Sequence, residues 1–416
     1  MFPLSNRRPQ TVDVSTEELS IAEIQARIRF LQDPAAWATL DPTCRYIETV
    51  ETQMSWVFLG RHAALKLKKP IRTPELDFTT LQSRIWHCQE ELRLNARLAP
   101  GVYRGLMALV STSRSHANHQ GTEGLHLSPP QPTDQPGYRL RPWCDEAGTG
   151  GASECLVWMR RLPKRRMMSR LIAKGQLRTV EVHQLGQTLA RFYTQAPRVP
   201  MDPHLWRSRY CDEWATHQRV LLGPWGEGLV SAAWMHRAWR AQALMASALA
   251  QRCAQGAFVE GHGDLRPDHV CFWTSPVVID ALEFNARLRW VDPVDELDYL
   301  ALECEVLGAA WIGDRLWSAW QGHAMDRDAL STQPTPPTTP TSPIRHLYRL
   351  RRSLLRARLC IAHLMSPRPR TPQRWRPLAR RYLQCADKSL QAIEDAANSL
   401  SMALDNKAPA DATVTL

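Results

Sequence analysis

Two aspartates within residues 258–285, FVEGHGDLRPDHVCFWTSPVVIDALEFN, have a spacing that suits phosphoryl-transfer chemistry. Asp264 follows His262 and Gly263 in a short polar loop, and Asp280 comes directly after the apolar run VVI. Phosphoryl transfer needs one carboxylate to orient the acceptor hydroxyl and take its proton, and a second to hold the metal ion that bridges the phosphates. The segment VCFWTSPVVI between the two aspartates has the pattern of a hairpin, which would bring both carboxylates to one place.

The loop HGDLRPDH resembles the catalytic loop of the aminoglycoside and choline-type phosphotransferases, a variant of the protein-kinase pattern H-x-D-x-x-x-x-N. The segment VVIDALEF resembles the strand and metal-binding aspartate that replace D-F-G in that family. The resemblance covers roughly residues 45–365, through the segments ETQMSWVFLGRHAALKLKKP, ELDFTTLQSR, EELRLNARLAPGVY, VIDALEFNARLRWVDPVDEL and LYRLRRSLLRARL. Together these are similar to an uncharacterised branch of the aminoglycoside phosphotransferase-like (choline-kinase/kinase-like) family.

This resemblance implies an α+β, protein-kinase-like fold of two lobes, with a β-rich N-terminal lobe and a mostly helical C-terminal lobe. It implies ATP and Mg²⁺ as cofactors, Asp264 as the catalytic base and Asp280 as the principal metal ligand. His269 stands where the related loop carries a metal-binding asparagine, so we expect it to contact the metal ion or phosphate in a modified way. Because an imidazole nitrogen suits softer ions than magnesium, Asp268 or Glu283 is the alternative ligand.

Two lysines in the run ALKLKK are candidates for binding the nucleotide phosphates. Ala64 and Lys66 match the A-x-K of the kinase V-A-I-K strand, whose lysine contacts the α- and β-phosphates. Side chains alternate along a strand, so Lys68 would share the face of Lys66 and could take its place. A carboxylate from the next helix must position such a lysine. Glu90 and Glu91 both lie there, and Glu91 falls where similar proteins place the partner.

The remaining parts of the expected nucleotide site carry weaker patterns. No G-x-G-x-x-G precedes the lysine run, so backbone amides near Gln53 and Met54 and the hydroxyl of Ser55 would have to cover the phosphates. The absence of G-x-x-x-x-G-K-[ST] argues against a P-loop kinase. The segment VWMRRL occupies the place of the hinge between lobes, where backbone groups near Met159 would meet the edge of adenine.

Apolar periodicity predicts a strand-rich first part and a helix-rich second part. Three runs separated by short polar breaks predict an antiparallel meander: TCRYIETV, SWVFL and AALKLK. A helix capped by Asp77 should follow and end before Pro100, and further strands are predicted at VYRGLMALV, YRLRPW and CLVWMRRL. Two long amphipathic helices, at 347–364 and 383–400, should end the folded chain.

Segments of low complexity set the predicted boundaries. We expect a disordered N-terminus at 1–15, an N-terminal lobe at 16–155 and a C-terminal lobe at 156–400 that holds the catalytic hairpin 258–285. The polar, aperiodic run at 111–137 predicts a mobile insertion in the first lobe, and the Pro/Thr-rich run at 327–343 predicts another in the second. Residues 401–416 should form a disordered tail.

The composition excludes several classes of protein. Apolar residues make up 44% and charged residues 22%, as in ordinary globular chains. No apolar run is long enough to cross a membrane, the N-terminus lacks the apolar stretch of a secretory signal, and the ten cysteines include no CxxC pair. These features favour a cytoplasmic location without a membrane partner. The net charge of +11 could serve nucleic acid, but we expect the arginines at 345–358 to form a solvated helix face that pairs with nearby carboxylates, and we expect no nucleic-acid partner.

These observations predict an ATP-dependent phosphotransferase that acts on a hydroxyl group of a small-molecule acceptor. The alternative, motivated by His269 in the asparagine position, is a nucleotide-binding pseudokinase or scaffold without transfer activity. The sequence does not identify the acceptor, the choice between ATP and GTP, or the oligomeric state, because fold analogy does not define a substrate.

Overall fold

The computed structural model describes residues 19–73, 75–112, 137–144, 151–328, 342–367 and 369–405. The predicted disordered N-terminus at 1–15, most of the two predicted insertions and most of the predicted tail lie outside these residues. The chain divides into two compact units, one up to Leu162 and one from Pro163, whereas the sequence prediction put the border near residue 155. Each unit is described by itself.

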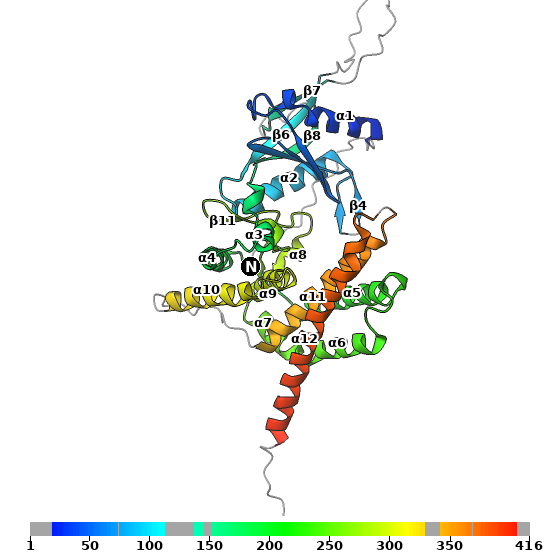
Figure 1. Ribbon diagram of the computed structural model, residues 1–416, viewed down its shortest axis with the longest axis vertical. Helices are drawn as coiled ribbons and strands as arrows, with labels where there is room; N and C mark the ends of the chain where they lie inside the picture. Colours follow the sequence, from blue (N-terminus) through cyan, green and yellow to red (C-terminus); the bar gives the residue numbers. More distant parts are fainter. Residues whose placement is uncertain are drawn as a thin grey trace, which may run out of the picture. The chain divides into compact units, whose positions relative to one another are not determined.

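A six-stranded antiparallel sheet forms the centre of the N-terminal unit (Figure 1). Its strand order is β1-β2-β3-β8-β6-β7. The strands are β1 (Glu48–Glu51), β2 (Ser55–Leu59), β3 (Ala63–Lys68), β6 (Tyr103–Ser111), β7 (Tyr138–Pro142) and β8 (Ala152–Arg160). A separate two-stranded ladder joins β4 (Arg72–Thr73) to β5 (Leu76–Asp77). The predicted antiparallel meander is therefore confirmed, since β2 pairs with both β1 and β3.

Two helices, α1 (Ile21–Gln32) and α2 (Leu81–Ala96), cover opposite faces of this sheet (Figure 1). Leu31 of α1 belongs to a core cluster with Leu65 and Leu67 of β3. On the other face, Cys88 of α2 packs with Val157 of β8. Because side chains alternate along a strand, Lys66 and Lys68 of β3 point toward the face that α2 covers.

The N-cap of the helix predicted after the meander lies three residues later than the predicted cap, Asp77. Thr80 is the N-cap of α2, and its hydroxyl accepts a hydrogen bond of 3.1 Å from the backbone N–H of Ser83. Asp77, the predicted cap, ends β5 and accepts hydrogen bonds from the backbone N–H and the hydroxyl of Thr79. The prediction of Asp77 as the cap was therefore wrong, because this aspartate closes a local turn of its own.

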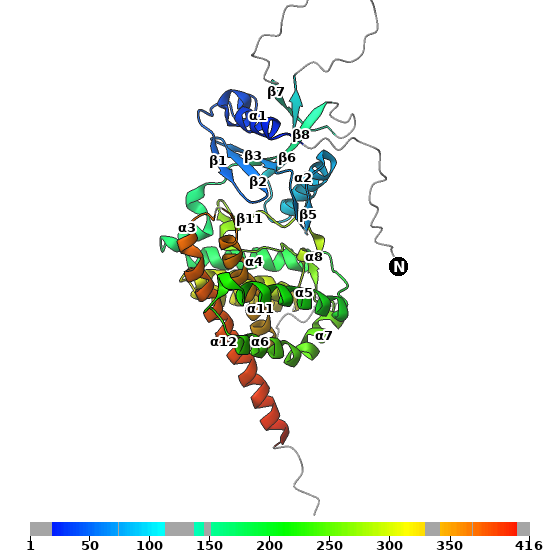
Figure 2. The same ribbon diagram turned by 90° about the vertical axis from the view of Figure 1, so that its right-hand side faces the viewer.

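The C-terminal unit is mostly helical (Figure 2). Its helices are α3 (Met168–Ala173), α4 (Thr179–Gln195), α5 (Pro203–Leu221), α6 (Ala232–Leu244), α7 (Ala246–Ala254), α8 (Ala286–Arg289), α9 (Pro293–Val306), α10 (Trp311–Asp328), α11 (Ser342–Leu364) and α12 (Pro372–Asp405). Its short strands are β9 (Val259–Glu260) with β12 (Trp290–Val291), and β10 (Val270–Phe272) with β11 (Pro276–Val278). The two long helices predicted at the end of the chain are confirmed as α11 and α12, which pack along each other, and the last turns of α12 extend beyond the other helices of the unit (Figure 2).

Helix α9 forms the interior of this unit. All of its residues except Glu305 are buried, and it packs against both α10 and α11. Asp292 caps its N-terminus by accepting a 3.0 Å hydrogen bond from the N–H of Val294. A helix this enclosed can fix the position of any loop that its side chains contact.

The α+β class and the division into a β-rich first lobe and a helical second lobe are as the sequence predicted. Among the described residues, no helix is long and apolar enough to cross a membrane.

Candidate active site

The predicted phosphate-binding lysines lie with Glu91 in one buried cluster of the N-terminal unit. Lys66 Nζ donates to Glu91 Oε1 at 2.8 Å, and Lys68 Nζ donates to Glu91 Oε2 at 2.7 Å. The side chains of Glu91 and Lys68 have no exposed surface, whereas Lys66 retains 13%. Helix α2 thus supplies the carboxylate that the sequence predicted, and this carboxylate serves both lysines at once.

Two further residues of the predicted nucleotide site lie in the same unit but outside this cluster. Ser55 begins β2, is 2% exposed, and its N–H donates to the hydroxyl of Thr52 at 2.9 Å. Met159 lies in β8 opposite Ala64 of β3 and packs in the core cluster of Cys88. The roles of Ser55 and Met159 toward a nucleotide remain predictions.

In the C-terminal unit, the HGD loop is held by a buried glutamate from α9. Glu296 has no exposed surface, and its carboxylate accepts hydrogen bonds from the N–H groups of His262 (2.9 Å) and Gly263. Burial raises the pKa of Glu296 although these N–H groups and the hydroxyl of Tyr193 favour its charged form. A side chain at Gly261 would clash with the same carboxylate, and Gly263 has a φ of 90°, a conformation that favours glycine. The two glycines therefore allow the loop to close over Glu296.

The carboxylate of Asp264 is oriented from two sides. Tyr299 of α9 donates its hydroxyl to Oδ1 at 3.1 Å, and Arg266 donates its Nε–H to Oδ2 at 2.9 Å. Burial alone would raise the pKa of Asp264, but the guanidinium of Arg266, followed by smaller contributions from His269 and others, lowers it to about 2. The carboxylate is therefore ionised near neutral pH, and its side chain remains 24% exposed.

The two histidines of the loop have defined tautomers. His262 Nε2 contacts the carbonyl oxygen of Ile279 at 2.9 Å and therefore carries the proton, and burial lowers the pKa of His262 to about 4. His269 Nδ1 lies 2.9 Å from the carbonyl oxygen of Asp264, and its Nε2 lies 3.1 Å from Nη2 of Arg266. The first contact requires a proton on Nδ1, and the second requires a lone pair on Nε2, since guanidinium nitrogens only donate.

Asp280 lies just beyond the hairpin of β10 and β11, as the sequence predicted. Its φ of 65° is in the left-handed region, where a residue other than glycine carries strain of about 1–3 kcal/mol. Oδ2 of Asp280 lies 3.6 Å from His269 Nε2, and Oδ2 of Asp264 lies 3.8 Å from His269 Nδ1. The loop and the hairpin therefore bring both predicted carboxylates to the same imidazole ring.

The residues present fit a magnesium ion that is bound together with phosphates. Asp280 offers carboxylate oxygens on a side chain that is 47% exposed. Mg²⁺ prefers oxygen ligands and usually takes one or two carboxylates, with phosphate oxygens and water completing its shell. Within the residues that the structure describes, no group of three or more His, Cys, Asp or Glu side chains could hold a metal ion. The fit is therefore through Asp280 with a nucleotide, and not through a cage built by protein alone.

Sequence reasoning missed three residues that order this site: Arg266, Tyr299 and Glu296. Arg266 stands within the HGDLRPDH loop itself, where its three-residue spacing from His269 was a usable signal. Tyr299 and Glu296 reach the loop from α9, more than 30 positions along the chain. Nothing in their local sequence marks them, because their partners are distant in the chain.

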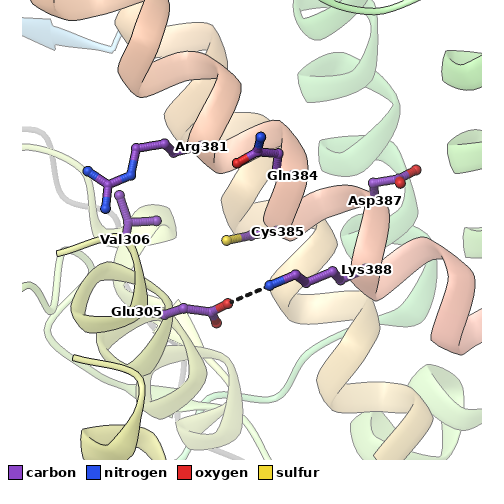
Figure 3. Close-up of a pocket in the computed structure, with 7 residues that line it drawn as sticks. All are labelled: Glu305, Val306, Arg381, Gln384, Cys385, Asp387 and Lys388. Atoms are coloured by element: carbon purple, nitrogen blue, oxygen red, sulfur yellow. Dashed lines mark hydrogen bonds and ion pairs between the residues drawn. The ribbon is translucent and has the colours of Figure 1, made fainter. Parts of the chain in front are cut away.

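One pocket of the C-terminal unit, with a volume of about 400 Å³, lies between the end of α9 and α12 (Figure 3). Glu305 and Lys388 on its wall form an ion pair of 3.4 Å, and Arg381 and Cys385 also line it (Figure 3). None of the predicted site residues lines this pocket.

Comparisons with known proteins give relatives of low identity. No protein-family model matches the chain. Uncharacterized proteins of Mycobacterium bovis and Mycobacterium tuberculosis are 27% identical over 276 residues, which is 65% of this chain and 48% of theirs. The chain thus spans about half the length of the curated relatives it matches.

The solved structures that resemble the chain include proteins named as choline or ethanolamine kinases. A choline/ethanolamine kinase family protein from Mesorhizobium loti is 13% identical with a TM-score of 0.46, covering 90% of this chain and 99% of that one. The choline kinase LicA from Streptococcus pneumoniae is 11% identical with a TM-score of 0.45, covering 89% and 99%.

Proposed function

We propose that this protein is a phosphotransferase that moves the γ-phosphoryl group of ATP to a hydroxyl group of a small molecule. The observation that carries the proposal is the position of His269, which has Asp264 Oδ2 at 3.8 Å on one side and Asp280 Oδ2 at 3.6 Å on the other. Two carboxylates one ring apart, one ordered by hydrogen bonds and one exposed, correspond to the two acidic roles of phosphoryl transfer.

In the N-terminal unit, Lys66 is the proposed phosphate ligand. It shares Glu91 with Lys68 but keeps 13% of its side chain exposed, whereas Lys68 has none. An ammonium group with exposed surface can meet a phosphate, and a fully enclosed one can hold the glutamate in place. We therefore assign phosphate binding to Lys66 and the positioning of Glu91 to Lys68.

In the C-terminal unit, Asp264 would accept the hydrogen bond of the acceptor hydroxyl and take its proton as the oxygen attacks the γ-phosphorus. Its low pKa of about 2 suits a group that orients the hydroxyl and receives the proton late. Tyr299 and Arg266 each bind one of its oxygens and so define the direction of the remaining lone pairs. Asp280 and the nucleotide phosphates would hold the metal ion, which supplies neutralisation of the phosphate charge.

Transfer of labelled γ-phosphate from ATP with Mg²⁺ to a panel of sugars, amino alcohols and nucleosides tests the proposal. Asp264→Asn should lower transfer by about 100- to 10,000-fold, the usual range for loss of a general base. Binding of ATP, measured by calorimetry, should be unchanged in this variant. Asp212→Asn is the matched control, because this exposed carboxylate lies on α5 and has no role in the proposal.

The pseudokinase alternative predicts a different pattern in the same experiments. Its motivation is His269 in the place of a metal-binding asparagine. If wild type and Asp264→Asn both bind ATP and neither transfers phosphate to any acceptor, the result would favour that alternative and contradict the proposed transfer.

A further inference from the structure

His269 is placed by a short turn that returns it to Arg266. Residues Pro267–His269 form a 3₁₀ turn, closed by a 2.9 Å hydrogen bond from the N–H of His269 to the carbonyl oxygen of Arg266. The turn brings His269 back beside Arg266, whose Nη2 lies 3.1 Å from His269 Nε2.

Both nitrogens of this ring are already engaged within the loop. Nδ1–H donates to the carbonyl oxygen of Asp264, which leaves a single lone pair, on Nε2. That lone pair accepts a hydrogen bond from Arg266. One lone pair cannot serve an N–H donor and a metal ion together, so coordination through Nε2 would require Arg266 to leave.

Arg266 in turn has two fixed contacts. Its Nε–H binds Asp264 Oδ2 at 2.9 Å, while Nη2 binds His269. The guanidinium is planar and rigid, so two anchors on different nitrogens define both its position and its plane. The neighbours Leu265 and Pro267 are buried, which holds the backbone on either side of the arginine.

We propose that His269 is a positioning residue that fixes Arg266 against Asp264, and that it is not a ligand of the metal ion. The inference rests on the proposed function, because it assigns the metal ion to Asp280 alone among the side chains around this ring. It replaces the expectation, drawn from the asparagine position, that His269 binds metal. His269 thus serves Asp264, the carboxylate that receives the proton. Asp264 lies on the other side of the imidazole ring from Asp280.

The kinetic test compares His269→Ala with His269→Gln. Loss of the imidazole should lower kcat by about 100-fold, the scale expected when a catalytic group is misplaced by about 1 Å. Glutamine, whose amide oxygen can accept from Arg266 near the place of Nε2, should restore part of that loss. The Mg²⁺ concentration for half-maximal rate should stay the same in both variants. A rise of tenfold or more in that concentration would overturn the proposal.

Metal binding is measured separately from turnover. Titration of Mn²⁺ into protein with a non-hydrolysable ATP analogue, followed by electron paramagnetic resonance, should give equal affinity for wild type, His269→Ala and His269→Gln. Asp280→Asn should weaken Mn²⁺ binding at least tenfold and so shows that the assay responds to loss of a ligand. Equal weakening by His269→Gln and Asp280→Asn would establish His269 as a ligand and refute the positioning role.

A double-mutant cycle decides whether His269 acts through Arg266. If it does, Arg266→Ala combined with His269→Ala should be no slower than Arg266→Ala alone, because coupled residues are not additive. A double variant whose decrease in kcat equals the product of the decreases in the two single variants would contradict the proposal. If His269→Ala does not fold, His269→Leu takes its place in the cycle, because leucine cannot accept a hydrogen bond from Arg266.

A failure of the proposed function can be told apart from a failure of this inference. Wild-type protein that neither binds Mn²⁺ with the nucleotide analogue nor transfers phosphate would refute the function. The ring nitrogens of labelled histidine still report the contact in that case, by nuclear magnetic resonance. An Nδ1–H tautomer of His269 whose Nε2 signal shifts in Arg266→Lys supports the contact with Arg266, and an Nε2–H tautomer refutes it.

Discussion

Glu91 is a fully buried carboxylate that accepts hydrogen bonds from two lysine side chains. Removal of three charges from water is costly, and such a cluster is retained only when its geometry is good or its charges have a use. Lys66 and Lys68 contact different oxygens of Glu91, so neither lysine competes with the other. The carboxylate thus determines the position of both ammonium groups, including the one assigned to phosphate.

We expect Glu91→Gln to lower the free energy of unfolding by about 3–5 kcal/mol, because it removes a buried negative charge that pairs with two lysines. Urea denaturation followed by circular dichroism measures the change. Glu90→Gln is the matched control on the same helix. Its carboxylate pairs with Arg93, and the side chains of Glu90 and Arg93 are 14% and 49% exposed, so a smaller loss of about 1 kcal/mol is expected there. Equal losses in the two variants would contradict the account of the cluster.

Asp280 carries backbone strain that a comparison of two substitutions can reveal. At a φ of 65°, glycine has no steric penalty, whereas alanine is disfavoured by about 1–2 kcal/mol. Asp280→Gly should therefore be more stable than Asp280→Ala by about 1 kcal/mol in urea denaturation, although glycine also makes the unfolded chain more flexible. Both variants lose the carboxylate, so its contribution cancels from the comparison. An alanine variant that is the more stable of the two would exclude strain at this position.

At the residue scale, the sequence predicted the groups that could do chemistry and missed the groups that orient them. The imidazole ring of His269 lies between Asp264 and Asp280. Glu91 forms one cluster with Lys66 and Lys68. Motif spacing predicts such groups because each motif is local. Glu296 binds the loop from a distant helix, so its role depends on the packing of α9, which no local pattern contains.

At the element scale, the arginines of α11 find acidic partners on α9. Arg345 binds Asp298 at 2.7 Å, and Arg352 binds Asp295 through two hydrogen bonds of 2.8 Å. Two further pairs of these helices are Arg356 with Glu303 and Arg349 with Glu305. The predicted pairing of this basic helix with nearby carboxylates agrees with these contacts. The solvated face predicted with it was wrong, because the side chains of Arg349, Arg352 and Arg356 are only 12–17% exposed. Four guanidinium groups of α11 are thus committed to α9.

The start of α4 provides a prediction of pH dependence. Burial alone would raise the pKa of Glu181, but hydrogen bonds from Arg178 and Arg166 have the larger combined effect and lower the pKa from 4.5 to about 2. A carboxylate whose pKa is lower in the folded state stabilises the folded state at pH values above its pKa in the unfolded state. This stabilisation is lost as the pH falls toward the pKa in the folded state. Glu181→Gln should therefore cost about 1–3 kcal/mol at pH 7, and this difference should shrink between pH 4.5 and about 2.

Urea denaturation of wild type and Glu181→Gln at a series of acid pH values measures this difference. Asp212→Asn, on the exposed surface of α5, controls for the loss of one negative charge from the protein. A difference between wild type and Glu181→Gln that grows as the pH falls would reverse the sign of the argument and refute it. The contact matters beyond α4, because Arg166 also donates to the carbonyl oxygen of Phe272 in the hairpin that leads to Asp280.

Elements were more predictable than their ends. The alternation in SWVFL and AALKLK and the stripe of α11 follow from periodicities of two and 3.6, so β2, β3 and α11 were found from sequence alone. The start of α2 was not, since an aspartate before a helix can close its own turn, as Asp77 does with Thr79. Caps depend on the competition between such turns and the helix.

At the scale of the whole molecule, the proposed chemistry requires both units. Lys66 belongs to the unit that ends at Leu162, and Asp264 and Asp280 belong to the unit that begins at Pro163. The curated relatives are about twice as long as the part of them that this chain matches.

Binding of a nucleotide should change the stability of both units together. A ligand that binds only the folded protein stabilises it by about 2.7 kcal/mol at 100 times its Kd. Under the proposed function, one ATP molecule uses Lys66 and Asp280. We therefore expect Mg²⁺ with a non-hydrolysable ATP analogue to slow hydrogen exchange in β3 and in residues 262–280 at the same ligand concentration.

Two variants, each confined to one unit, test that linkage. Lys66→Met should remove the protection of residues 262–280, and Asp280→Asn should remove the protection of β3, because each weakens the binding of one shared ligand. Glu90→Gln should keep both effects, since Glu90 pairs with Arg93 on the surface of α2. Protection that persists in one unit after the substitution in the other would mean that the nucleotide engages a single unit, and Lys66 and Asp280 could not then act on the same phosphates.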